Sequence, residues 1–344
     1  MNYGIVLDST FARHITPAGH PERPQRIEAI LEAVQSWNPS GQLLVHVAPL
    51  PAQEEWLTAV HTPEHWQKIQ GTSGKAVSQL DPDTYTGPDS FETATLAAGS
   101  AVALTDELLQ GTIDSGFALV RPPGHHAESN RVMGFCLFNN IAVAADWAIR
   151  NRAVGKVAIV DFDVHHGNGT QEIFYTRSDV LYLSTHQYPF YPGTGHFNQL
   201  GEGAGEGFTV NFPLRAGAGN SFYCDLFSDL VLPIIRQFDP QLILVSAGYD
   251  AHKDDPLASM NLDVKGFGQL VSQLSALARD LCEGRMLFVL EGGYNLKALS
   301  EAVVCTMDTS MAPKTFQIGK KERTEEYVSY REQARRVFSP YWEV

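Results

Sequence analysis

The sequence predicts a single α/β domain in which helices cover both faces of a mostly parallel central β-sheet. Short apolar runs alternate with helical stretches along the chain, which is the pattern of buried strands connected by crossover helices. A chain of 344 residues, 44% of them hydrophobic, is long and apolar enough to bury a large core. We find no low-complexity tract, internal repeat or linker that would divide the chain.

The individual elements follow from apolar periodicity and from capping residues. The expected strands are the runs 3–7, 116–120, 156–160, 180–183, 241–245 and 285–290. The expected helices are 24–37, 62–70, 90–110, 140–150, 221–237, 264–282 and 296–307. Thr62 followed by Pro63 indicates one helix start, because threonine caps helices and proline fits the first helical position. We expect residues 1–312 to form the catalytic domain and residues 313–344 to dock on it.

Composition and charge narrow the class of protein. The formal net charge of −14 argues against nucleic-acid binding and is compatible with a cationic substrate. The chain has no run of eighteen apolar residues and no basic segment followed by an apolar one near Met1. We therefore expect neither a membrane span nor a signal peptide. Scattered cysteines fit reduced thiols in a cytoplasmic protein; they are Cys136, Cys224, Cys282 and Cys305.

The segment Asp-Phe-Asp-Val-His-His-Gly-Asn-Gly at residues 161–169 directly follows the apolar run 156–160. Residues two apart on an extended chain point to the same side, so Asp161, Asp163 and His165 can face a common centre. Two oxygens and a nitrogen suit Zn²⁺, Fe²⁺ or Mn²⁺ better than Ca²⁺ or Mg²⁺. Taken alone, the segment would also fit a polar strand end in solvent followed by a turn.

Other polar segments follow three further strands. Residues 121–126 read Arg-Pro-Pro-Gly-His-His, residues 246–250 read Ser-Ala-Gly-Tyr-Asp, and residues 291–294 read Glu-Gly-Gly-Tyr. Ligands of open α/β sheets bind at the carboxyl ends of the strands, so in a parallel sheet these segments share one edge. Asp163, His165 and Asp250 would then offer three metal ligands and leave one position open for water, as catalytic zinc sites do.

The remaining polar residues at this edge suit amide or ester hydrolysis. A bound metal would acidify water and polarise a carbonyl, and one imidazole of the pair His125-His126 could carry the proton. Asp161 could fix a histidine tautomer, and Tyr294 could donate its hydroxyl to an oxyanion. Taken singly, the histidines fit a rigid surface loop, Tyr294 a core residue after a turn, and Asp250 a helix cap. Their occurrence at successive strand ends argues against coincidence.

With these residues in hand, the chain closely resembles the histone deacetylase superfamily, specifically the bacterial class II type amidohydrolases with the arginase/deacetylase-like fold. The motifs RPPGHHA, GFCLFNN, DFDVHHGNGTQ, SAGYDAH and EGGY carry the resemblance, which runs from about residue 3 to 305. It implies Zn²⁺, with Fe²⁺ as an alternative, bound by Asp163, His165 and Asp250. It also implies roles for four further residues: His126 as general base and acid, His125 as an electrostatic helper paired with Asp161, and Tyr294 as the carbonyl-polarising hydroxyl.

The resemblance further implies two K⁺ sites. One would involve Asp161, Asp163 and His165 with Ser184 and Thr185. The other would lie around Phe174, Arg177, Val180 and Phe208. Asn168 departs from the class I pattern, in which an aspartate pairs with the second histidine, and a neutral partner raises that histidine's pKa less than a carboxylate would.

For the substrate, the resemblance implies a narrow channel between Phe135 and Tyr191 that accepts an aliphatic stem. The carbonyl of Gly134 would accept the N–H of the amide. Tyr191 stands where many eukaryotic relatives have phenylalanine. Arg26 would lie near an internal pocket through which acetate leaves; alternatively, it forms an ion pair at a helix start.

Two residues bear on substrate choice. Asp83 would hold a substrate backbone at the rim of the channel, or alternatively lie in a solvated turn. Leu257 stands where polyamine-deacetylating relatives have glutamate, so it favours acetyl-lysine in a peptide over a second cationic amine.

We therefore expect a zinc-dependent enzyme that removes acetyl groups from lysine side chains. The alternatives are a small-acylamide or acetylpolyamine amidohydrolase with the same chemistry and a catalytically idle acyl-lysine binding protein. An arginase-like dimanganese enzyme would need a further acid where Ser184 stands. The expected partner is an acetylated peptide or amine, and the sequence leaves a homo-oligomer open.

Overall fold

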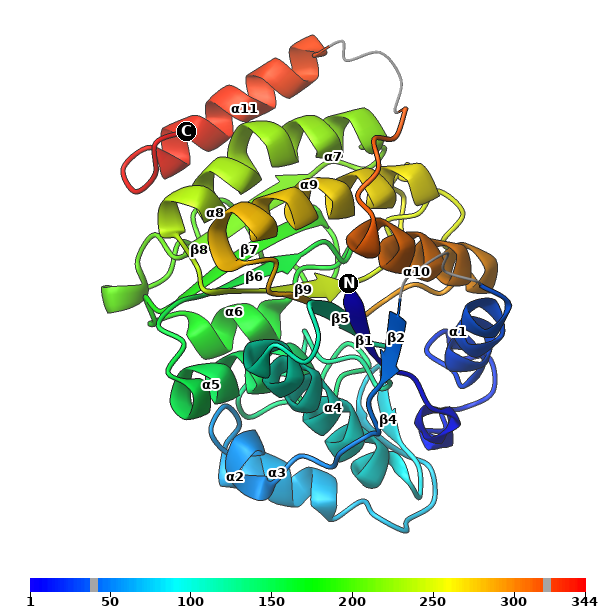
Figure 1. Ribbon diagram of the computed structural model, residues 1–344. Helices are drawn as coiled ribbons and strands as arrows, with labels where there is room; N and C mark the ends of the chain where they lie inside the picture. Colours follow the sequence, from blue (N-terminus) through cyan, green and yellow to red (C-terminus); the bar gives the residue numbers. More distant parts are fainter. Residues whose placement is uncertain (38–42, 318–322) are drawn as a thin grey trace.

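A computed structural model describes residues 1–37, 43–317 and 323–344 of the chain. Its central sheet has eight strands in the order β2-β1-β5-β10-β9-β6-β7-β8 (Figure 1). The strands are β1 (Asn2–Val6), β2 (Leu43–His46), β5 (Ser115–Ala118), β6 (Val157–Asp161), β7 (Val180–Gln187), β8 (Thr209–Leu214), β9 (Leu242–Ala247) and β10 (Met286–Leu290). Every neighbouring pair in this sheet is parallel, which confirms the predicted architecture.

All six predicted strands are present, and two further strands complete the edges of the sheet. β2 is a short, partly exposed edge strand, so it lacks the apolar run that identifies a buried one. β8 contains Pro213, which lowers the strand signal in the sequence. Proline is tolerated there because β8 lies at the edge of the sheet, where one set of backbone N–H groups needs no ladder partner. A separate antiparallel hairpin joins β3 (Ser78–Asp81) and β4 (Thr84–Thr86).

The helices are α1 (Gln25–Ser36), α2 (Glu54–Leu57), α3 (Pro63–Gln70), α4 (Ser90–Gln110), α5 (Asn140–Arg152), α6 (Asn168–Phe174), α7 (Asn220–Leu226), α8 (Leu232–Phe238), α9 (Val264–Cys282), α10 (Leu296–Met311) and α11 (Glu325–Phe338). Thr62 caps α3 by accepting the N–H of His65 at 3.2 Å, as its position predicts. The predicted helix 221–237 is divided into α7 and α8 by a π-helical turn at Phe227–Val231. The wide turn precedes Pro233, which lacks the N–H that a regular α-helix would use.

The helices form a layer on each face of the sheet (Figure 1). α7, α8, α9 and α10 cover one face, with α1 packed beside α10, and α4, α5 and α6 cover the other. Both layers exclude water from the strands, and every residue of β5, β6, β7, β9 and β10 is buried. Among the described residues, no helix has the length and apolarity needed to cross a membrane.

The end of the chain lies against α7 and α8 (Figure 1). Phe338 is fully buried, and the indole N–H of Trp342 donates to the carbonyl of Gly207 at 2.9 Å. The hydroxyl of Tyr327 donates to Asp229 at 3.0 Å. Residues 323–344 therefore pack on the body of the domain, whereas residues 318–322 of the expected C-terminal segment lie outside the described residues.

Candidate active site and metal centre

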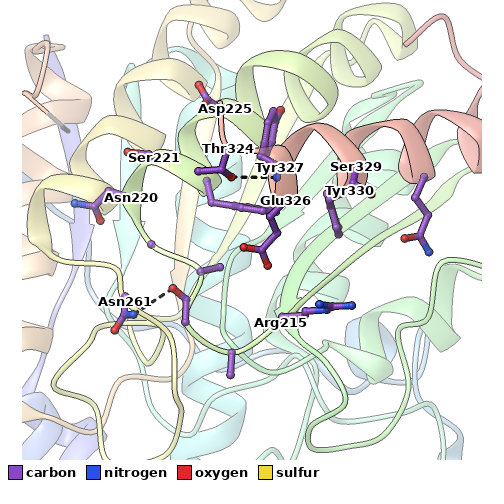
Figure 2. Close-up of a pocket in the computed structure, with 16 residues that line it drawn as sticks. Arg215, Asn220, Ser221, Asp225, Asn261, Thr324, Glu326, Tyr327, Ser329 and Tyr330 are labelled. Carbon is purple, nitrogen blue, oxygen red and sulfur yellow. Dashed lines mark hydrogen bonds between the residues drawn. The ribbon is translucent and has the colours of Figure 1, made fainter. Parts of the chain in front are cut away.

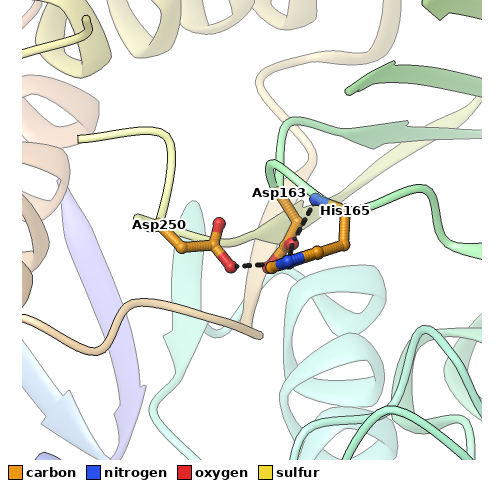
Figure 3. Close-up of side chains that lie close together, drawn as sticks. All are labelled: Asp163, His165 and Asp250. Atoms are coloured by element: carbon orange, nitrogen blue, oxygen red, sulfur yellow. Dashed lines mark hydrogen bonds and ion pairs between the residues drawn. The ribbon is translucent and has the colours of Figure 1, made fainter. Parts of the chain in front are cut away.

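Asp163, His165 and Asp250 converge at the carboxyl edge of the sheet (Figure 3). Asp163 and His165 follow β6 and Asp250 follows β9, and these two strands are paired neighbours. One ligand atom from each side chain lies within 4.8 Å of the other two. Nδ1 of His165 is 3.1 Å from a carboxylate oxygen of Asp250 and 3.3 Å from one of Asp163. The parallel sheet thus brings together residues that are 85 positions apart in the chain.

The electrostatics of these three groups favour a bound cation. Both acids are fully buried, and burial together with the charge of Asp163 raises the pKa of Asp250 to about 7. Burial would raise the pKa of Asp163 as well, but the charges of His125 and His165 hold it well below its usual value. Two buried carboxylates and one imidazole match the donor set of Zn²⁺ or Fe²⁺, whose charge would compensate both acids.

Two glycines provide the space that this arrangement needs. A Cβ atom on Gly248 would lie 1.9 Å from a carboxylate oxygen of Asp163, and one on Gly292 would lie 2.2 Å from a carboxylate oxygen of Asp250. The N–H of Gly292 donates to Asp163 at 2.8 Å. Any larger residue at these positions would displace the acids from the centre.

The two adjacent histidines have opposite environments. The Nδ1–H of His125 donates to Asp161 at 3.1 Å, and the hydroxyl of Tyr182 donates to the same carboxylate at 3.1 Å. Burial favours neutral His125, but the charges of Asp163, Asp161 and Glu291 outweigh it and raise its pKa to about 10. His126 is also buried, and burial with the charges of His125 and His165 lowers its pKa well below its usual value. One imidazole is therefore suited to stabilise negative charge and the other to accept a proton.

Tyr294 is positioned by contacts from three segments. Its backbone N–H donates to Asp255 at 2.7 Å, its ring lies edge-on to Phe135 at 5.8 Å, and Arg26 lies over its face. Burial raises the pKa of Tyr294 well above its usual value, so the hydroxyl keeps its proton and remains a donor. Arg26 also forms the alternative that the sequence suggested, a buried ion pair with Glu22 at 3.2 Å.

The residues expected to line the channel lie beside the two histidines and Tyr294. The ring of Tyr191 is edge-on to His126 at 5.3 Å, while Phe135, with φ of 69°, follows Gly134 at the turn. Asp83 lies partly exposed in the turn between β3 and β4, and its carboxylate accepts the N–H of Gly134 at 3.1 Å, so this turn residue contacts the segment that carries Phe135.

Leu257 is half-buried, and its N–H donates to Asp255 at 3.0 Å. Asp255 thus connects the segment of Leu257 to that of Tyr294, because it accepts N–H groups from both.

The residues of the expected K⁺ sites lie around β6, β7 and β8. Ser184 is paired with Asp161 across β6 and β7, and the hydroxyl of Thr185 lies 3.5 Å from the carbonyl of Asp161. In the second set, the N–H of Arg177 donates to the carbonyl of Phe174 at 3.0 Å. Val180 begins β7, and the carbonyl of Phe208 accepts the N–H of Tyr182 in the same strand at 2.9 Å.

Sequence reasoning missed several residues that support this site. The carboxylate of Glu291 accepts the N–H groups of Gly124 at 2.7 Å and His125 at 3.1 Å, and the ring of Phe190 stacks on His165 at 5.5 Å. Glu291 follows β10 directly, so an acid at a strand end was an available signal. Asp255 and Phe190 lie in loops, where no periodicity marks them.

A hollow with a volume of about 940 Å³ lies away from this centre, between α11 and the loop before α7 (Figure 2). The loop is held by Asn261, whose side-chain N–H donates to the carbonyl of Gly217 at 3.1 Å. None of the residues predicted for the catalytic site lines this cavity.

Known proteins share both the sequence and the fold. Residues 20–309 match the histone deacetylase domain. The chain is 38% identical over 295 residues to a probable deacetylase of Archaeoglobus fulgidus, covering 86% of this chain and 82% of that protein. It is 40% identical over 279 residues to the histone deacetylase-like amidohydrolase of Pseudomonas aeruginosa, covering 81% of this chain and 73% of that protein.

Relatives from plants are similar over part of their length. Histone deacetylase 5 of Arabidopsis thaliana is 39% identical over 333 residues, which cover 91% of this chain but 50% of the relative, so the chain spans about half of that protein.

The crystal structure of the HDA15 HD domain matches with a TM-score of 0.93 and 35% identity, covering 99% of this chain and 97% of that chain. On this sequence and structural evidence, the chain belongs to the histone deacetylase family.

Proposed function

We propose that the protein is a zinc-dependent hydrolase that cleaves the amide of N-acetylated lysine side chains and releases acetate. The observation that carries the proposal is the position of three groups at one sheet edge. The first group is the set of metal-ligand side chains Asp163, His165 and Asp250. The second is His126, whose lowered pKa leaves it neutral and able to accept a proton, and the third is Tyr294, whose raised pKa keeps its hydroxyl protonated. The family of the chain supports the same reaction class.

Each group of residues in the site has a separate role in hydrolysis. A divalent cation held by Asp163, His165 and Asp250 would acidify water and polarise the substrate carbonyl. His126 takes the proton of the attacking water and returns it to the departing amine. His125, kept charged by its acidic neighbours, and the hydroxyl of Tyr294 stabilise the negative charge that develops on the carbonyl oxygen.

Substrate selection belongs to the channel. Phe135 and Tyr191 would flank the aliphatic stem, and the carbonyl of Gly134 would accept the N–H of the amide. Leu257 offers an apolar, half-buried side chain and no charge for a second amine, which favours acetyl-lysine over an acetylpolyamine. Asp83 already accepts the N–H of Gly134, and its remaining lone pairs would hold a peptide backbone at the rim.

Three accompanying features complete the proposal. K⁺ would bind near Asp161, Ser184 and Thr185, and again near the carbonyls at the end of α6 and the start of β8. Residues 1–312 would form the catalytic domain, with residues 313–344 docked on it. A cytoplasmic location is supported by the scattered spacing of the cysteines, which suits reduced thiols.

Parallel measurement of kcat/KM on an acetyl-lysine peptide and on acetylspermidine, with zinc-loaded protein, tests the proposal. We expect a preference of about tenfold or more for the peptide, which corresponds to about 1.4 kcal/mol. The His126→Ala variant should lose nearly all turnover while keeping its metal. A preference for acetylspermidine would agree with the proposed mechanism but show that the substrate is a polyamine. Turnover of neither substrate would contradict the proposed activity.

A further inference from the structure

The side chain of Asn168 has an environment that fixes its orientation. Three groups face its Nδ2 end: a carboxylate oxygen of Glu128 at 2.7 Å, the sulfur of Met133 at 3.1 Å and the carbonyl of His126 at 3.4 Å. A carboxylate, a thioether and a carbonyl accept hydrogen bonds and donate none. This end of the amide must therefore be the NH₂ group, because an oxygen placed here would face three acceptors.

The orientation of the amide fixes the tautomer of His126. The other end of the amide, Oδ1, lies 2.8 Å from Nδ1 of His126. An amide oxygen only accepts, so Nδ1 must carry the proton of the ring. In a neutral imidazole the second nitrogen, Nε2, then has a free lone pair, which is what a general base needs.

We infer that Glu128 is a positioning residue for His126, which it controls through Asn168. The inference rests on the proposed function of His126. Of the three acceptors facing the amide, Glu128 is the strongest, because it is charged and makes the shortest contact. A neutral asparagine can rotate by half a turn and present its NH₂ group to His126, which would move the ring proton to Nε2. The carboxylate prevents this rotation.

The backbone of Glu128 is held so that its side chain reaches Asn168. The N–H of Glu128 donates to the carbonyl of Arg131 at 3.0 Å, and its own carbonyl accepts a hydrogen bond from the ring of His61 at 2.9 Å. The Glu128 side chain is only 23% exposed, so it is largely held against the protein. Arg131 forms an ion pair with the Glu128 carboxylate at 3.3 Å.

The first test introduces Glu128→Ala into the wild type and into the Asn168→Asp variant and measures kcat on an acetyl-lysine substrate. In the wild-type background we expect kcat to fall by about tenfold or more, with KM and bound zinc unchanged. The Asn168→Asp substitution gives His126 a carboxylate acceptor directly but places it against Glu128, so we expect it to be impaired by like-charge repulsion. Adding Glu128→Ala to it should then restore kcat. An equal loss in both backgrounds, or none in the wild type, would overturn the inference.

Glu172→Gln is the matched control. Its carboxylate accepts the N–H and the hydroxyl of Ser129, each at 2.9 Å, so it supports the same loop through Ser129 and not through the amide of Asn168. We expect its kcat to equal that of the wild type. If Glu128→Ala fails to fold, Glu128→Gln in the same two backgrounds keeps the test, because it removes the charge and preserves the size.

A second readout does not depend on turnover. In zinc-loaded protein labelled with ¹⁵N-histidine, NMR should show the proton of the His126 ring on Nδ1, with the signal assigned by its loss in His126→Ala. Glu128→Ala should increase the form that is protonated at Nε2. A wild-type proton on Nε2 would refute the inference even if no substrate were turned over, whereas a correct tautomer without turnover would count against the proposed function alone.

Discussion

The guanidinium of Arg26 lies over the ring of Tyr294, with its Cζ atom 5.0 Å from the ring centroid. The same guanidinium donates to the carbonyl of Gly293 at 2.7 Å and to that of Glu291 at 2.5 Å, so it holds the turn that carries Tyr294. Glu22, which also pairs with Arg121, compensates its charge. One buried cation in α1 thus sets the position of the hydroxyl that follows β10.

Arg26→Lys should lower kcat by about tenfold, because an ammonium keeps the charge but cannot reproduce the planar fork that binds two carbonyls. Arg13→Lys is the control. Arg13 pairs with Asp89 in an exposed contact and should affect neither activity nor stability. Steady-state kinetics on an acetyl-lysine peptide, with thermal unfolding alongside, check both. Unchanged kcat in Arg26→Lys would show that the turn is positioned without Arg26.

Tyr294→Phe should lower kcat by roughly 10²–10³-fold, the usual cost of removing one donor to a developing oxyanion. Its unfolding temperature should change little, since only the hydroxyl is lost. Tyr327→Phe provides the comparison, because it removes a hydroxyl bonded to Asp229 far from the centre and should leave kcat unchanged. If both variants behave alike, Tyr294 has no role in the chemistry.

Asp250→Asn should raise the unfolding temperature of the metal-free protein and lower that of the protein with bound Zn²⁺. Without metal, the substitution removes one of two mutually repelling buried acids and keeps the oxygen that accepts the N–H of Val164, so the unfolding temperature should rise. With Zn²⁺ it should fall, because ligand binding at 100 times Kd stabilises the wild type by about 2.7 kcal/mol and the variant binds more weakly. Calorimetry with Zn²⁺ and with a chelator checks this. The same sign in both states would contradict a metal role for Asp250.

Acid should destabilise the protein through His61. Burial, reinforced by the neighbouring His65, lowers the pKa of His61 to about 3, whereas an unfolded histidine titrates near 6.5. Between these values the unfolded chain binds a proton that the folded chain does not, so stability is complete above pH 6.5 and is lost as the pH falls. Relative to His61→Gln, the wild type should lose about 1.4 kcal/mol per pH unit below 6.5. Denaturant unfolding from pH 7 to 5 measures the difference, and parallel pH curves would contradict it.

Trp342→Ala should lower the free energy of unfolding by about 3–5 kcal/mol, since it deletes a buried indole that packs on Phe208 and Phe238. Its kcat should not change, because none of these residues contacts the metal centre. One cooperative transition at lower denaturant is the expected result. Two separate transitions would show that the C-terminal segment does not stabilise the catalytic domain.

The sequence by itself determined the architecture and the composition of the centre. Apolar runs identified the buried strands, and α4 and α9 begin and end where their periodicity and caps predict, at Ser90–Gln110 and Val264–Cys282. Because the carboxyl ends of parallel strands meet at one edge, the sequence alone assigns the residues after each run to one site.

Only the tertiary structure decided which groups orient that site. The contact of Glu128 with Asn168, the stack of Arg26 on Tyr294 and the hydrogen bond from Tyr294 to Asp255 join residues that are 40, 268 and 39 positions apart in the chain. The sequence did not predict β8, because this strand contains Pro213. Proline fits there because β8 lies at the edge of the sheet, and the order of the strands along the chain does not show which strand lies at an edge. Local periodicity reports which face of a segment is buried, whereas such contacts depend on how the segments are placed relative to each other, which is set by packing of the whole chain.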